Sequence, residues 1–193
     1  MYIVSTVFVC YLTFKSLENT VIWNGVFWII ILFSLTNAIS KSFANENSSY
    51  QLFIYTLVNP RALILGKIIY NTLLTFVLVI IAYLLFSVFI QTDNSSTTPL
   101  IFITGLVLGS FAISSTLTLV SAIAAKTNNN LGILAILAFP IVLPTLLIAI
   151  KITSLGMQGG SWSDISDQII MLSAINMMVV TLAFLLFPYL WRQ

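Results

Sequence analysis

The side chains whose types and spacing could do specific work lie in one short polar stretch between two apolar runs. Ser48 and Gln51 have the spacing of a capping box, in which each side chain bonds the backbone N–H of the other residue at the start of a helix. Pro60 ends that helix, because proline disfavours the α conformation at Asn59, and Asn59 can then cap a new helix. Arg61 follows at this corner, where it could bind a lipid phosphate or a carboxylate of a partner. The chemistry indicated here is binding, not catalysis.

Residue types that support catalysis or metal binding are scarce. The chain has no histidine, the usual general base and metal ligand near neutral pH, and its single cysteine, Cys10, allows no intrachain disulfide. We find no nucleotide-binding loop, no paired carboxylates and no nucleophile beside a base. We therefore predict that the chain is not an enzyme, holds no catalytic or metal site, and takes its energy from another subunit. The net charge of +2 gives no sign of nucleic-acid binding.

The segment before the corner, residues 48–59, is predicted to be an amphipathic helix that lies on the membrane surface. Its apolar side chains recur at helical spacing and form one face: Tyr50, Phe53, Ile54, Leu57 and Val58. Because this helix is joined directly to the span that begins at Pro60, a partner that pushes on it would tilt that span. Permease subunits of ATP-driven exporters have this layout.

The composition predicts an all-α integral membrane protein with a single transmembrane domain over residues 1–193. Of the residues, 60% are hydrophobic and 6% are charged, and the mean hydropathy is +1.10. A span needs about 20 mainly apolar residues, so the chain is long enough for six spans. The expected spans are residues 1–14, 21–39, 60–90, 100–125, 131–152 and 169–191.

The first apolar run is short for a span. Its 14 residues cover about 21 Å as a helix, against about 30 Å of hydrocarbon. A signal peptide has a basic region before its apolar stretch, and this run has none. We expect further residues before Met1 in the natural protein.

The distribution of basic residues predicts the orientation. If both termini are cytoplasmic, five basic residues lie in the cytoplasm (Lys41, Arg61, Lys67, Lys126 and Arg192) and two lie outside (Lys15 and Lys151). The surface helix is then cytoplasmic as well.

Two motifs inside the spans favour close packing or motion. Gly105 and Gly109, continued by Ser110 and Ser114, are small residues that let helices approach closely in lipid. They indicate packing within the chain, a subunit interface or a groove that faces a substrate. Pro140 and Pro144 interrupt the fifth span, as a fixed kink or as a hinge for alternating access.

Polar residues elsewhere in the spans have structural interpretations. Asn37, Asn71 and Asn176 are expected to form hydrogen bonds between helices. Ser163 or Asp164 is expected to cap a helix that leads into the last span, with Trp162 at the depth of the membrane interface.

The sequence resembles the CcmB family, the haem exporter protein B of cytochrome c maturation. Two segments carry the resemblance: QLFIYTLVNPRALILGK around the corner, and LGILAILAFPIVLPTLLIA with its two prolines. The similarity covers essentially the whole chain. Two departures stand out, since family members usually begin with a basic amphipathic segment that is absent here, and Gln51 stands where an acidic residue is common. Glu46 could partly replace that residue.

The resemblance implies a permease in the bacterial inner membrane, similar to the ABC-2 type. It would work with the ATPase CcmA, which binds ATP, with the membrane subunits CcmC and CcmD, and indirectly with the haem chaperone CcmE on the outer face. The expected surface that couples the chain to the ATPase comprises Glu46, Ser48, Tyr50, Gln51, Phe53, Ile54, Leu57, Asn59, Pro60 and Arg61.

Haem would be a transported or partner-bound ligand, not a cofactor of this chain. Without histidine, the chain cannot supply a histidine ligand to the haem iron. We therefore favour a role in driving release of the haem-loaded chaperone. The alternatives are an ABC-2-type exporter permease for a lipid or another amphiphilic small molecule, and a membrane scaffold that transports nothing.

Overall fold

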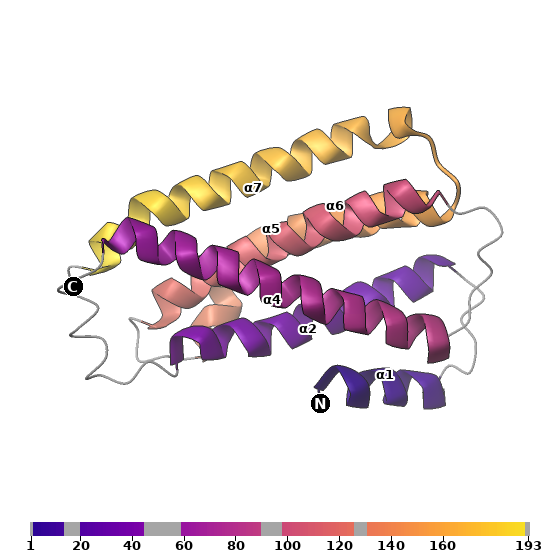
Figure 1. The fold of residues 1–193 in the computed structure, drawn as a ribbon, viewed down its shortest axis with the longest axis horizontal. Helices are drawn as coiled ribbons and strands as arrows, with labels where there is room; N and C mark the ends of the chain where they lie inside the picture. The colour runs from indigo at the N-terminus through magenta and orange to yellow at the C-terminus, as the bar shows by residue number, and fades with distance from the viewer. Residues whose placement is uncertain (1, 14–19, 45–58, 90–97, 126–130, 192–193) are drawn as a thin grey trace.

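The computed structural model describes residues 2–13, 20–44, 59–89, 98–125 and 131–191, and this part of the chain is helical with no strand. The helices are α1 (Tyr2–Thr13), α2 (Thr20–Ala44), α4 (Pro60–Phe89), α5 (Pro99–Ala125), α6 (Leu131–Met157) and α7 (Trp162–Trp191) (Figure 1). The predicted all-α class is confirmed.

Five of these helices, α2, α4, α5, α6 and α7, are long and apolar enough to cross a membrane. The chain is therefore a multi-pass membrane protein. The sixth, α1, has 12 residues and reaches about 18 Å, which is less than the thickness of the hydrocarbon core. Several helices extend past the predicted spans, because hydropathy marks only the part in hydrocarbon while the helix continues through polar residues at the interface.

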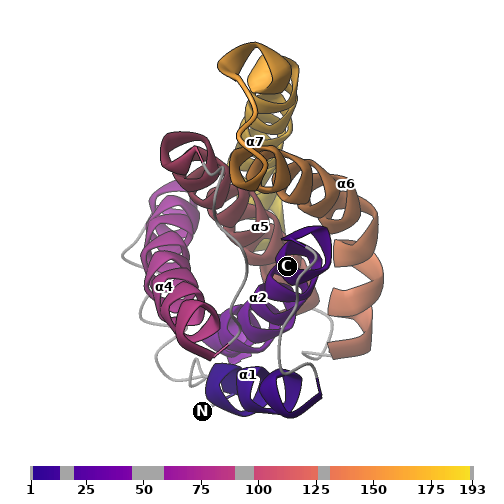
Figure 2. The same cartoon turned by 90° about the vertical axis from the view of Figure 1, so that its right-hand side faces the viewer.

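Helix α5 is the centre of the bundle. It contacts α2, α4, α6 and α7, and Figure 2 shows these helices arranged around it. Most residues of α5 are buried, whereas α4 and α7 each expose a broad apolar face. Helix α1 packs on α2 and α4 at the edge of the bundle.

An aromatic cluster holds α2 against α4. Trp23 stacks on Phe27 with ring centroids 5.5 Å apart, and both rings meet Phe86 of α4 edge to face, at 5.3 and 5.4 Å. All three side chains are buried. Edge-to-face pairs add stability beyond the area that they bury, so this cluster fixes the spacing of the two helices.

The start of α7 corrects one expectation. Ser161, not Ser163, is the cap: its backbone N–H and its hydroxyl both donate to the Asp164 carboxylate, at 3.0 and 2.7 Å. Asp164 is thus the second member of a capping box, three residues into the motif. Because Ser161 caps the helix, Trp162 and the polar residues after it already belong to α7.

Candidate functional site

The predicted corner between surface helix and span is visible from Asn59 onward. The Asn59 side-chain oxygen accepts the backbone N–H of Arg61 at 3.1 Å, and its carbonyl accepts that of Leu63 at 3.1 Å. Pro60 occupies the first helical position, where a backbone N–H would have no partner within the helix, so its absence costs no hydrogen bond. Asn59 therefore caps α4, and the direction of α4 is fixed at the residue where the chain enters it.

The other members of the expected coupling surface lie outside the described residues. They are Glu46, Ser48, Tyr50, Gln51, Phe53, Ile54 and Leu57. Their proposed role remains a prediction.

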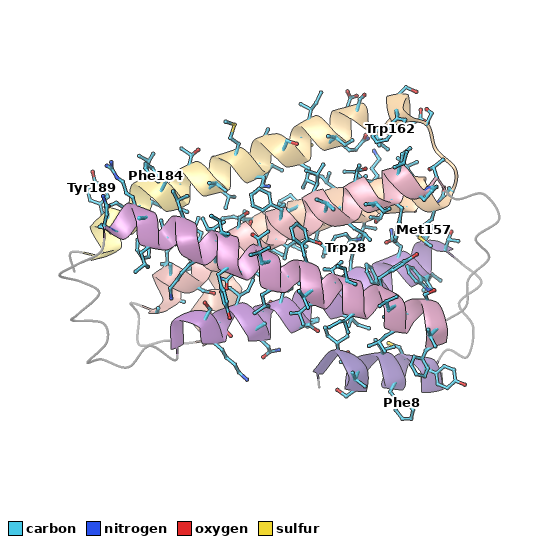
Figure 3. The ribbon with its side chains drawn as sticks, viewed as in Figure 1. Phe8, Trp28, Met157, Trp162, Phe184 and Tyr189 are labelled. Atoms are coloured by element: carbon cyan, nitrogen blue, oxygen red, sulfur yellow. The ribbon has the colours of Figure 1, made fainter. Side chains whose placement is uncertain are left out.

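Arg61 is exposed, but its position is defined by α7. Its guanidinium carbon lies 5.1 Å from the centroid of the Phe184 ring, a distance suited to a cation–π contact. Figure 3 shows Phe184 near the end of the bundle where α7 finishes and α4 begins. The guanidinium is thus held beside α7 while the Arg61 side chain stays exposed.

Lys67 joins the first turns of α4 to the end of α2. Its ammonium group donates to the backbone carbonyl of Ser42 at 3.0 Å. Ser42 lies in the last turn of α2, where a carbonyl receives no hydrogen bond from its own helix. Ser42 and Lys67 flank residues 45–58, which contain the expected surface helix. This bond joins the two helices that flank that segment.

Gly105 and Gly109 face other helices of the same chain. A Cβ atom on Gly105 would lie 2.8 Å from the Thr153 methyl, and one on Gly109 would lie 2.6 Å from the Trp28 ring and 2.7 Å from Ala149 Cβ. Only glycine allows α5 to approach α2 and α6 this closely. Both positions are buried, and they join three helices at one point.

Trp28, Asn24 and Thr153 form a polar junction beside these glycines, which was not predicted. The Thr153 hydroxyl accepts the indole N–H of Trp28 at 3.0 Å. Its own hydrogen has three possible acceptors: Asn24 Oδ1 at 3.0 Å, and the carbonyls of Ala149 at 2.8 Å and Ile150 at 3.1 Å. The Asn24 amide donates to the Ile150 carbonyl at 2.8 Å. The available signal was Asn24 itself, an amide within an apolar run.

Replacing Thr153 with valine is expected to lower the free energy of unfolding by about 1–2 kcal/mol, because the indole N–H and the Asn24 oxygen would lose their shared partner. The readout is the thermal unfolding midpoint of the purified protein in detergent. Thr181→Val is the matched control, since Thr181 is exposed and bonds the Met177 carbonyl of its own helix. Equal shifts for the two variants would contradict the role of the junction.

Asparagines behave as predicted at two of three positions. Asn71 of α4 donates to the Thr118 hydroxyl of α5 at 3.0 Å, and Asn176 of α7 accepts from the Ser115 hydroxyl of α5 at 2.8 Å. Asn37 instead bonds the Phe33 carbonyl of its own helix. It is exposed, so no neighbouring helix offers it a partner.

Ser110 and Ser114 lie in the buried interior of the bundle, with 0% of each residue exposed. The Ser114 hydroxyl is 3.5 Å from the Thr72 hydroxyl of α4. These two serines therefore lie among helices of this chain.

The two prolines lie within α6, which is assigned as one helix through both of them. Figure 2 shows that the path of α6 bends. Pro140 and Pro144 are exposed, and each leaves the carbonyl four residues earlier without its helical donor. The hinge role of this bend stays a prediction.

Among the residues that the structure describes, no group of three or more histidine, cysteine, aspartate or glutamate side chains could hold a metal ion. The arrangement consists of a capped corner, close helix contacts and buried hydrogen bonds.

Comparison with known proteins gives one match. The model of the family described as CcmB protein matches residues 8–190, nearly the full length. No curated protein and no solved structure matches the chain.

Proposed function

The chain belongs to the CcmB family of haem-export permeases in cytochrome c maturation, and from this membership we propose that it couples ATP hydrolysis by a separate subunit to release of a haem-loaded chaperone on the outer side. The family is one of transporter permease subunits, not of catalysts. The partners in this proposal are CcmA as the ATPase, CcmC and CcmD as membrane subunits, and CcmE as the chaperone. Both termini are proposed to face the cytoplasm from the bacterial inner membrane.

The capped corner at Asn59 and Pro60 is the observation that supports coupling. Because Asn59 caps α4 and Lys67 bonds the end of α2, the two helices that flank residues 45–58 are held together. An ATPase bound to that segment would move both helices as a pair. A loosely attached loop would absorb the same push.

Haem enters this proposal as a ligand of partners or as cargo. The sequence contains no histidine, so a histidine ligand for the iron would come from another subunit. This favours transmission of motion over direct handling of haem by this chain.

The direct test is purification of the full-length chain with its ATPase from membranes that also contain the haem-loaded chaperone. We expect the ATPase to co-purify, and addition of ATP to release the chaperone. A variant of the ATPase that binds but does not hydrolyse ATP serves as the control and should retain the chaperone. ATP turnover that leaves the chaperone bound would refute the proposal.

A further inference from the structure

Helix α5 presents a row of hydroxyl groups to α4. Ser110, Ser114 and Thr118 follow one another at intervals of one helical turn, so they lie on one face of α5. Each of the three residues is 0% exposed. Hydroxyls at such depth in a membrane protein need partners from the protein itself.

Two polar residues of α4 use part of this row. Asn71 donates its amide hydrogen to Thr118 Oγ1 at 3.0 Å, and Thr72 Oγ1 lies 3.5 Å from Ser114 Oγ. The first bond is well formed, while the second is at the limit of a hydrogen bond. The third hydroxyl of the row, that of Ser110, forms no hydrogen bond with a described residue of α4.

Unpaired atoms lie at this contact. Ser110 Oγ and Asn71 Oδ1 are buried and have no hydrogen-bond partner among the described residues, and the same is true of Ser121 Oγ further along α5. Buried polar atoms without partners are uncommon and call for an explanation. Here, unpaired atoms lie on both sides of the contact between α4 and α5.

The two helices run in opposite directions, as their contacts show: Asn71 meets Thr118 near one end, and Tyr83 meets Phe102 near the other, with ring centroids 5.6 Å apart. Suppose that α4 slides along α5 by one helical turn, in the direction in which the chain of α4 runs. Asn71 would then lie level with Ser114, and Thr72 would lie level with Ser110. The Thr118 hydroxyl would stay paired, because it already donates to the Ser114 carbonyl at 2.7 Å.

The same step in the opposite direction is less favourable. It would place Asn71 level with Ala122, which has no polar side chain. The row of hydroxyls thus favours one direction of movement.

We propose that α4 has two registers on α5 that differ by one helical turn, about 5.4 Å. In the second register, Asn71 exchanges Thr118 for Ser114, and Thr72 exchanges Ser114 for Ser110. The lipid-facing side of α4 does not oppose this movement, since only 28% of the most apolar stretch of the helix is buried. The contacts that the movement must break are those of Lys67 and Phe86 with α2. The inference concerns the chain alone and holds whatever subunit drives the movement.

Cross-linking can detect both registers. Cys10 is the single cysteine, so Cys10→Ser gives a background free of thiols. Tyr83→Cys with Phe102→Cys reports the observed register, and Val79→Cys with Phe102→Cys reports the shifted one, because Val79 would then lie level with Phe102. The full chain is treated in its native membranes with a short thiol cross-linker, then cut at a protease site inserted between α4 and α5, and the fraction of joined halves is measured.

We expect both pairs to cross-link above the background set by Ile80→Cys with Phe102→Cys, since Ile80 is 60% exposed and faces away from the bundle. Ser110→Ala should lower the yield of the Val79 pair by about fivefold, the effect of one interhelical hydrogen bond. Ser121→Ala is the matched control, because Ser121 is also buried and unpaired but gains no α4 partner in the shifted register.

Two results would overturn the inference. A Val79 pair that cross-links no better than the Ile80 pair would show that α4 keeps one register, with the unpaired atoms bonded to water. Equal effects of Ser110→Ala and Ser121→Ala would show that the row of hydroxyls does not select the register. Neither readout uses transport or ATPase activity, so failure of the proposed function would leave the test intact.

Discussion

Replacing Gly109 with alanine is expected to lower the free energy of unfolding by about 1–3 kcal/mol, and replacing it with valine by more. The added Cβ would lie 2.6 Å from the Trp28 ring and 2.7 Å from Ala149 Cβ. Neither neighbour can move cheaply, because the Trp28 indole is hydrogen-bonded to Thr153 and Ala149 has no flexible side chain. Helix α5 would have to withdraw from α2 and α6 together, and the junction of Asn24 and Thr153 would open.

This effect can be measured as the amount of folded protein in the membrane and as the unfolding midpoint in detergent. Gly25→Ala and Gly66→Ala are the controls, since a Cβ at either position meets no atom within 4 Å. Both should be neutral or slightly stabilising, because alanine loses less backbone freedom than glycine in a helix. If Gly109→Ala behaves like Gly66→Ala, the close contact at Gly109 is not needed for the fold.

The second large effect is expected from Phe53→Asp combined with Arg61→Glu. These changes place a carboxylate in the apolar face of the expected surface helix and reverse the charge at the corner. Under the proposed function, the chain should lose affinity for its ATPase by about 2 kcal/mol or more, roughly thirtyfold, as for a disrupted interface centre. Cytochrome c maturation should fall with it.

The fold should survive these changes, because Arg61 is exposed and its contact with Phe184 is weak. Lys151→Glu is the matched charge reversal, because Lys151 is also exposed and lies six residues before Met157 in α6. Figure 3 shows Met157 and Phe184 at opposite ends of the bundle. It should leave ATPase association unchanged. A double variant that reaches the membrane, still binds the ATPase and still supports maturation would refute the coupling hypothesis.

Helix positions could be predicted from the sequence because burial in lipid demands long apolar runs. The start of α4 was predicted to the residue, since Asn59 and Pro60 carry a local signal that needs no tertiary information. The ends of α2 and α6 were placed too early, because helices continue into the interface where polar residues are tolerated. At α7 the cap Ser161 was missed, although its spacing to Asp164 follows the capping-box rule.

Tertiary contacts were harder to predict. The small residues at Gly105 and Gly109 indicated a close approach, but nothing local showed that the partners are Trp28 and Thr153. Threonine is only mildly polar, and its hydroxyl can bond its own helix, so Thr153 gave no signal. The candidate coupling surface was defined mainly by residues before Asn59, and for those the prediction still awaits its test.

The hydrogen bonds between α2 and α6 can form only after α6 has been synthesised. Of the five long helices, α2 is the least apolar, with a mean hydropathy of 1.7 against 2.6 for α4. Its Asn24 depends on Thr153, which lies 129 residues later. At ribosomal speeds roughly 6–26 s separate their emergence. During that interval the Asn24 side chain lacks its Thr153 partner, in a helix that is less apolar than α4. Insertion of α2 is therefore provisional until α6 arrives, and this interval is when an insertase or a quality-control protease would compete for the nascent protein.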